Sequence, residues 1–155
     1  MPYFRRTTPT PVVTGGYQAY RPYVRADFRE QCAYCLLHEI WAGGDSNFEL
    51  DHFRPQSLFP REENNFYNLY YACHPCNRTK WGHWPPTALR AKGIQLVDLC
   101  RDDFDTHFRE EPDGTWTALT DSAAYTLDLL RLNRRHLVEL RRILKRNHLS
   151  THRPP

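Results

Sequence analysis

Two short motifs, Cys32-Ala-Tyr-Cys35 and Cys73-His-Pro-Cys76, decide how this chain folds. Zn²⁺ prefers thiolates in a tetrahedral array, and each C-x-x-C pair supplies two sulfurs at the spacing that such a site needs. We therefore predict a structural Zn²⁺ held by Cys32, Cys35, Cys73 and Cys76. Four protein ligands leave no open position for a substrate, so this metal would join two distant segments of the chain. The alternatives are buried thiols or a redox pair, but neither motif lies in the thioredoxin-like context of a redox C-x-x-C.

The composition is that of a globular protein: 155 residues, 40% of them hydrophobic and 25% charged. One compact domain is the expected organisation. No run approaches the roughly 18 apolar residues of a membrane helix, and the first residues lack the apolar core of a secretory signal. We expect a cytoplasmic protein with no membrane partner. The odd count of five cysteines argues against a disulfide framework.

The segments around and between the two motifs predict short strands and helices. Residues 47–53 alternate apolar and polar side chains, as a short strand does, and Arg54-Pro55 would end it. Residues 68–72 form a second apolar stretch that runs into the second motif, and a helix is expected from about Asn77. Residues 25–31 have helix-forming composition and would lead into the first motif.

The last third of the chain predicts a hairpin and two helices. Glu-Pro-Asp-Gly at 111–114 is a turn signal within a hairpin over 104–119. Asp121 or Ser122 can cap a helix. A second helix is predicted from about Arg134, where leucines recur at helical spacing: Leu137, Leu140 and Leu144. We divide the chain into an extended arm (1–24), a core (25–100) and a C-terminal extension (101–155), all within one compact domain.

Six short elements occur in order over residues 32–80. They are the first C-x-x-C, Asp51-His52, Asn68-Leu69, the second C-x-x-C, Asn77 directly after it, and Lys80 three residues on. In this pattern the chain resembles the HNH endonucleases. The resemblance implies an α+β fold with a treble-clef-like ββα-metal core and a structural zinc, extended here by the C-terminal hairpin and basic helices.

The resemblance also implies roles for individual residues. Asp51 and Asn77 would hold a catalytic cation, His52 would be the general base, and Asn68 would hold the loop between the strands and orient the base. Asn stands where many family members have His. A neutral oxygen ligand favours Mg²⁺ or Mn²⁺ over Zn²⁺ at this second site.

Phosphodiester hydrolysis explains why these residue types belong together. A neutral imidazole can take the proton of the attacking water, and a hard cation held by oxygen ligands can contact the phosphate and the leaving oxygen. Asp51 and His52 are adjacent, so on a regular strand they would point to opposite faces, and a local bend must bring both to the phosphate. The alternatives are purely structural roles: Asn68 as a turn residue and Asn77 as a helix cap.

Basic residues suggest where nucleic acid binds. In the family context we expect Arg78 and Lys80 to contact phosphates. From residue 131 onward eight side chains, Arg153 included, are Lys or Arg and only Glu139 is acidic. We expect this C-terminal helix to contact phosphates rather than bases through Arg134, Arg135, Arg141, Arg142 and Lys145. Trp81 and Trp84 are interpreted as a cap on the core rather than as a platform for bases.

The function expected from these features is metal-dependent cleavage of phosphodiester bonds, in DNA rather than RNA. The remainder past residue 85 is loosely similar to small stand-alone prokaryotic HNH proteins, some of which are nuclease subunits of anti-phage systems beside an ATPase partner. Two rivals stay open. One is a zinc-stabilised nucleic-acid-binding module without catalysis, and the other is a nuclease subunit that a partner must switch on.

Overall fold

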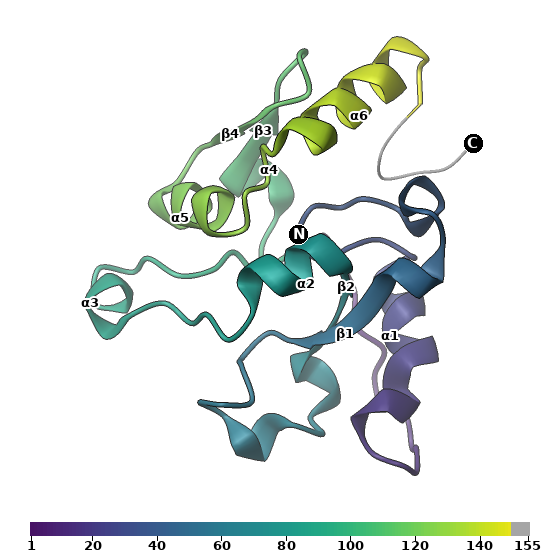
Figure 1. Ribbon diagram of the computed structural model, residues 1–155. Coiled ribbons are helices and arrows are strands. Elements are labelled where there is room, and N and C mark those ends of the chain that lie inside the picture. The colour runs from purple at the N-terminus through teal and green to yellow at the C-terminus, as the bar shows by residue number, and fades with distance from the viewer. Residues whose placement is uncertain (150–155) are drawn as a thin grey trace. The chain divides into compact units, whose positions relative to one another are not determined.

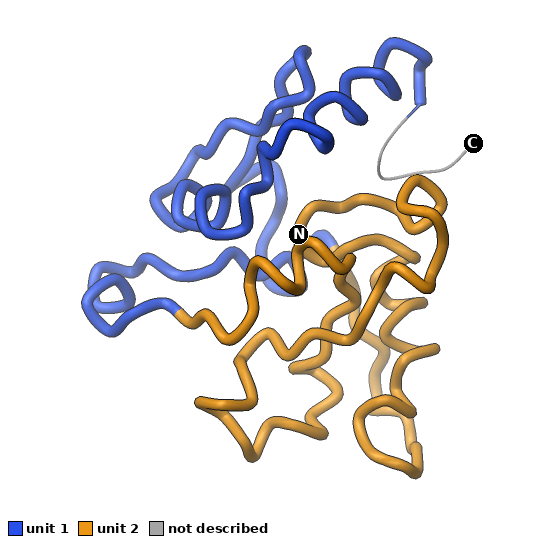
Figure 2. The backbone as a smooth tube through the Cα atoms, viewed as in Figure 1, with its two compact units in different colours: residues 1–3, 85–155 blue, residues 4–84 orange. Residues whose placement is uncertain are grey.

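The computed structural model describes residues 1–149, and these divide into two compact units (Figure 2). Unit 2 comprises residues 4–84, and unit 1 comprises residues 1–3 together with the chain from Pro85 onward. The chain passes from one unit to the other after Trp84. The expected division at residues 24 and 100, within one compact domain, stays a prediction. Arg153 lies outside the described residues. Within residues 1–149, no helix combines the length and the apolar character needed to cross a membrane.

Unit 2 is built on one antiparallel pair of strands followed directly by a helix (Figure 1). Leu50 pairs with Tyr71 and His52 pairs with Leu69. Both strands lie within one residue of their predicted positions. The helices and strands of unit 2 are, in chain order, α1 (Arg21–Asp27), β1 (Phe48–His52), β2 (Leu69–Cys73) and α2 (His74–Lys80), with a 3₁₀ turn (Tyr17–Tyr20) before α1.

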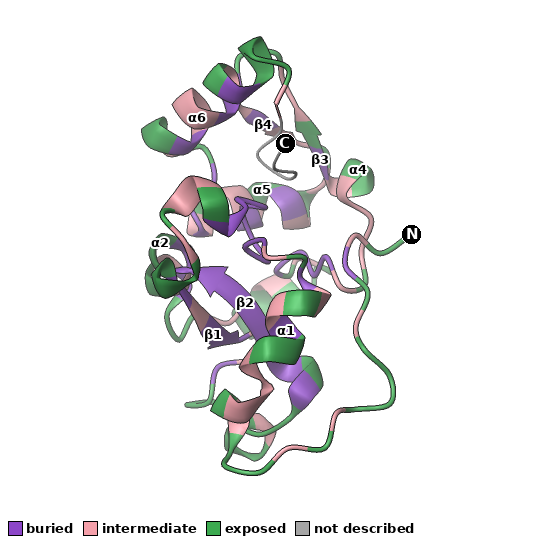
Figure 3. Cartoon of the chain, turned by 90° about the vertical axis from the view of Figure 1, so that its right-hand side faces the viewer, coloured by how far each residue is buried: buried purple, intermediate pink, exposed green. Residues whose placement is uncertain are grey.

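The core of unit 2 forms around β2, which is buried along its whole length (Figure 3). α1 contacts β2, and α2 contacts both strands. The ring of Phe28, just after α1, lies 5.2 Å from that of Tyr70, and Tyr71 stacks on Phe48 at 4.7 Å. Aromatic pairs at these separations stabilise a core beyond the area that they bury.

Two helices of unit 2 begin earlier than expected. α1 begins at Arg21 instead of about residue 25, and α2 begins at His74 instead of Asn77. Each has a proline in its first turn, Pro22 and Pro75. Proline suits this place because its missing N–H would have no partner within the helix. The second cysteine motif therefore spans the junction of the two elements: Cys73 ends β2, and Cys76 lies in the first turn of α2.

Unit 1 contains the predicted hairpin, in shorter form. Glu110 pairs with Trp116, and the Gly114 N–H donates to the Glu111 carbonyl across the predicted turn. Gly114 has a φ of +90°, and a Cβ there would lie 2.4 Å from the Val138 carbonyl, so the turn requires glycine. The elements of unit 1 are α3 (Thr87–Arg90), α4 (Phe104–His107), β3 (Phe108–Glu110), β4 (Trp116–Ala118), α5 (Asp121–Leu129) and α6 (Arg135–Arg146).

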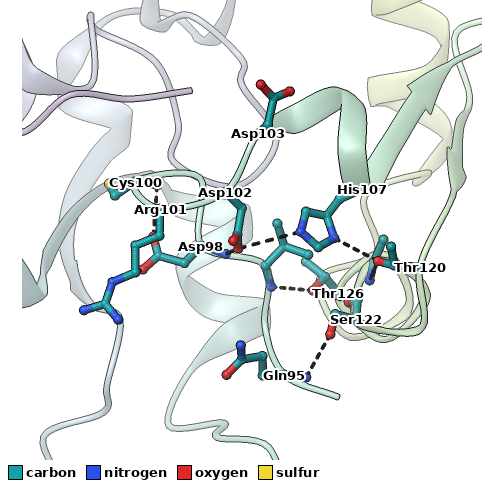
Figure 4. A network of polar contacts seen from close by, with 12 residues as sticks. Gln95, Asp98, Cys100, Arg101, Asp102, Asp103, His107, Thr120, Ser122 and Thr126 are labelled. Atoms are coloured by element: carbon teal, nitrogen blue, oxygen red, sulfur yellow. Dashed lines mark hydrogen bonds and ion pairs between the residues drawn. The ribbon is translucent and has the colours of Figure 1, made fainter. Parts of the chain in front are cut away.

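Hydroxyl side chains at the start of α5 connect it to the rest of unit 1 (Figure 4). Thr120, rather than the predicted Asp121 or Ser122, caps the helix by accepting from the Ala123 N–H at 3.1 Å. The Ser122 hydroxyl instead accepts from the Gln95 N–H, and Thr126 accepts from the Val97 N–H at 3.0 Å. These bonds attach the preceding loop to α5.

Candidate metal centre and catalytic pocket

The four cysteines of the two motifs come together in one buried cluster. Their sulfur atoms all lie within 4.8 Å of one another, and the Cys35 and Cys73 sulfurs are 3.7 Å apart. A tetrahedron with Zn–S bonds of about 2.3 Å has sulfurs about 3.8 Å apart. The geometry and the donor set therefore fit a structural zinc on Cys32, Cys35, Cys73 and Cys76.

The chemistry of the packed thiols supports a cation at this place. Hydrogen bonding to Cys32 and Cys35 raises the pKa of the Cys73 and Cys76 thiols. Four buried thiols crowded together resist ionisation, whereas a divalent cation at their centre stabilises four thiolates. The cluster links the turn after α1 to the junction of β2 and α2, and the Ala33 N–H donates to the Tyr71 carbonyl of β2 at 2.7 Å.

A pocket of about 360 Å³ lies at the end of β1 in unit 2. Asp51, His52 and Asn77 all line it, although the first two are neighbours in the chain and the third comes from α2. Both Asp51 and His52 lie within β1, which ends at His52, and both pair in register with β2. The other lining residues are Tyr17, Leu50, Pro55, Gln56, Ser57, Trp81 and Gly82.

The imidazole of His52 is held in one orientation. Its Nε2 lies 2.9 Å from the backbone carbonyl of Glu63. A carbonyl can only accept, so Nε2 carries the proton, and Nδ1 is the nitrogen with a free lone pair in the neutral ring. The ring of Tyr17 meets the imidazole edge-on, with 4.8 Å between ring centroids. Sequence reasoning had not associated Tyr17 or Glu63 with this site.

The Asn68 side chain fixes the loop between the two strands by hydrogen bonds. Its Oδ1 accepts from the Arg54 N–H at 2.8 Å, and its Nδ2 donates to the Arg54 carbonyl at 3.0 Å and the Glu62 carbonyl at 3.4 Å. The side chain thus links Arg54, near the start of the loop, with Glu62, the residue before Glu63. It acts on His52 only through that loop, which supplies the Glu63 carbonyl.

The Asp51 carboxylate is buried beside a buried ammonium group. Lys80 Nζ lies 3.0 Å from Asp51 Oδ2 and donates to the His52 carbonyl at 2.7 Å. The Tyr34 hydroxyl also donates to Asp51, since burial and the neighbouring carboxylate raise the pKa of Tyr34. Burial raises the pKa of Asp51, although Lys80 and Tyr34 favour its ionised form. Lys80 is fully buried, so the expectation that it contacts phosphate is wrong for this structure.

Glu49 sets the orientation of the Asn77 amide. Asn77 Nδ2 donates to Glu49 Oε2 at 2.5 Å, and Glu49 Oε1 lies 3.3 Å from His74 Nε2. An ionised carboxylate only accepts, so the amide nitrogen faces Glu49 and the amide oxygen faces away from it. Glu49 was missed, although it stands two residues before Asp51 and hence on the same face of β1.

The predicted phosphate-binding residues of the C-terminal segment are mostly engaged within unit 1. Arg141 is buried, so the prediction that it contacts phosphate is corrected. Arg142 pairs with Glu139, Lys145 Nζ lies 3.0 Å from a Glu110 carboxylate oxygen, and Arg134 donates to backbone carbonyls. The predicted residues that are exposed are Arg135 on α6, Lys145, and Arg78 on α2.

These features define a mixed α and β protein in which a zinc-binding cysteine cluster supports a polar pocket. The HNH endonuclease family matches residues 32–81, about a third of the 155-residue chain. The chain thus carries an HNH domain, which spans both cysteine motifs, β1, β2 and α2. The family implies a nuclease that acts on nucleic acid. No curated protein matches the chain.

Proposed function

We propose that this protein is a metal-dependent endonuclease that hydrolyses phosphodiester bonds in DNA, with β1, β2 and α2 as its ββα-metal unit. The observation that carries the proposal is that Asp51, His52 and Asn77 line one pocket. Binding alone would not require a carboxylate, an imidazole and an amide together at the end of one strand.

His52 is the general base. Its Nδ1 takes the proton of the attacking water, while the Glu63 carbonyl keeps the proton on Nε2 and holds the ring. Asn68 maintains that arrangement by fixing the loop. Asn68 is therefore a positioning residue.

Asp51 and the Asn77 amide oxygen would hold the catalytic cation, Mg²⁺ or Mn²⁺. Both offer hard oxygen ligands to the same pocket, so the donor set fits these ions. The bound cation supplies charge neutralisation at the phosphate and at the leaving oxygen. Lys80 favours the ionised form of the buried Asp51 and orients its carboxylate, and Glu49 orients the Asn77 amide.

Substrate phosphates are proposed to bind to exposed basic side chains. Arg78 extends from α2, the helix that also carries Asn77. On α6, Arg135 is exposed, and Arg142 and Lys145 can exchange their carboxylate partners for phosphates, because exposed ion pairs contribute only about 0–1 kcal/mol.

The biological setting is proposed from the resemblance to small HNH proteins. In this proposal the protein acts in the cytoplasm, as the nuclease subunit of an anti-phage system beside an ATPase partner. The segment at 126–134, followed by a basic helix, supports this setting.

The test is to incubate the purified protein with plasmid, single-stranded DNA and RNA, across Mg²⁺, Mn²⁺, Ni²⁺ and Zn²⁺, with and without chelator. Cleavage of DNA that depends on Mg²⁺ or Mn²⁺ is expected. Binding of nucleic acid with no cleavage under any of these conditions would favour the zinc-stabilised binding module.

A further inference from the structure

Two tryptophans follow α2, and the structure separates them. The ring of Trp84 packs edge-on against Phe53 at 5.9 Å and Phe59 at 5.3 Å, as the predicted core cap. Trp81 is 78% exposed. Its interpretation as part of a core cap is therefore wrong, and burial does not explain why a large aromatic stands there.

Trp81 belongs to the rim of the catalytic pocket. It lines the pocket with Asp51, His52 and Asn77, and so does Tyr17, which comes from the 3₁₀ turn before α1. The Tyr17 ring also contacts the His52 imidazole. Two aromatic side chains from distant segments thus stand beside the residues proposed to act on the phosphate.

The backbone at Trp81 is strained. Its φ is +44°, a conformation that bulky L residues rarely adopt and that glycine adopts readily. Strain of this kind persists where the surrounding structure imposes it, and it gathers at functional sites. An exposed and strained tryptophan stabilises the fold little, which points to a role in binding.

We propose that Trp81 is a stacking platform for a nucleobase next to the scissile phosphate. Every nucleobase has a flat π face, so an exposed aromatic ring binds unstacked bases with little sequence preference. In a paired duplex the neighbouring bases cover those faces. The substrate is then nucleic acid with an unpaired nucleotide at the cleavage position, such as a single strand. This inference rests on the proposed function, because that function identifies the pocket.

The first test measures binding of a short single-stranded DNA oligonucleotide without added divalent cation or chelator, so that zinc is retained. Trp81→Ala should weaken binding on the order of 5- to 100-fold, whereas Trp81→Phe should retain most of it. The matched control is Tyr23→Ala, because Tyr23 is 43% exposed in α1 but does not line the pocket. Equal binding by wild type and Trp81→Ala would overturn the proposal.

The second test removes the base instead of the ring. Single abasic sites are placed at successive positions of the oligonucleotide. At one position the loss should weaken wild-type binding about as much as Trp81→Ala does, and the two losses should not add, since they delete the same contact. Additive losses at every position would contradict stacking on Trp81.

Stability and cleavage complete the test. Trp81→Gly should relieve the strain and raise the melting temperature by about 2–4 °C while weakening binding; a lower melting temperature would assign Trp81 to packing instead. Cleavage assays with Mg²⁺ and Mn²⁺ run in parallel. Non-additive losses of binding for Trp81→Ala and one abasic site, without any cleavage, would contradict the nuclease proposal alone. Equal cleavage of single strands and duplex, with additive losses of binding at every position, would contradict the stacking proposal alone.

Discussion

Each of the two units combines an antiparallel strand pair with a helix that carries a fully buried cation, but the partners of the two cations differ. In unit 2, Lys80 of α2 faces the Asp51 carboxylate at the candidate catalytic pocket. In unit 1, the Arg141 guanidinium of α6 lies 4.1 Å from the Trp116 ring centroid and donates to the Leu132 carbonyl at 3.0 Å.

The difference shows which buried charges bear on function. Neutral carbonyls and an aromatic ring accommodate a cation as part of the packing. Burial raises the pKa of the Asp51 carboxyl, whereas the neighbouring ammonium favours its ionised form, the form that the proposed function requires for holding a second cation. The partner of the buried charge, more than its burial, distinguishes the candidate site from the structural core.

Removing the zinc site should unfold unit 2 and leave unit 1 folded. Cys73→Ser is expected to lose zinc and unfold the HNH domain, because structural zinc binding is worth on the order of 10 kcal/mol or more. Elemental analysis and thermal unfolding measure the effect. Cys100→Ser is the control, since Cys100 lies in unit 1 and outside the cluster. Unchanged zinc content and melting temperature in Cys73→Ser would refute the site.

Replacing each buried cation by methionine sharpens the comparison. Lys80→Met leaves Asp51 buried without its ammonium partner, which should cost about 3–5 kcal/mol. Arg141→Met leaves the Leu132 carbonyl and the Trp116 ring, both neutral, without the guanidinium and should cost about 1–3 kcal/mol, as measured by urea unfolding. Adding Asp51→Asn to Lys80→Met should restore part of the stability, because the unpaired charge is gone. A greater loss for Arg141→Met, or no restoration, would contradict the distinction.

The smallest effect is expected at the exposed end of α6. Arg135→Ala should reduce the slope of log binding constant against log salt by roughly 0.9 on duplex DNA, the value for one lost phosphate contact. Arg101→Ala should leave the slope unchanged, although the Arg101 side chain is 78% exposed, since it lies outside α6. If both variants behave alike, α6 has no special part in binding.

The strands, the hairpin turn and the cysteine cluster were readable from the sequence because each has a local signal. Alternating side chains and Pro55 delimit β1, Glu-Pro-Asp-Gly specifies the turn of the hairpin, and paired C-x-x-C motifs imply a tetrahedral site. The HNH match over residues 32–81 confirms the resemblance.

Burial of charge was not predicted, because a charged residue on a helix is by default assigned to solvent. A signal for Arg141 was present: it follows Leu137 by four residues and precedes Leu144 by three, which places it on the buried face of α6. Lys80 has no such pattern in the sequence, because the burial of its ammonium group depends on the contact between α2 and Asp51 on β1. Trp81 and Tyr17 meet at the pocket only through the tertiary fold.

The central claim is that His52 is the general base of a nuclease. His52→Ala should lower the cleavage rate on the order of 10²- to 10⁴-fold while zinc content, melting temperature and binding of single-stranded DNA stay as in wild type. His52→Gln keeps an amide N–H near the position of Nε2 for the Glu63 carbonyl and should be equally inactive, which separates loss of the base from loss of the fold. Cleavage by His52→Ala at the wild-type rate, in a preparation freed of contaminating nucleases, would contradict the account.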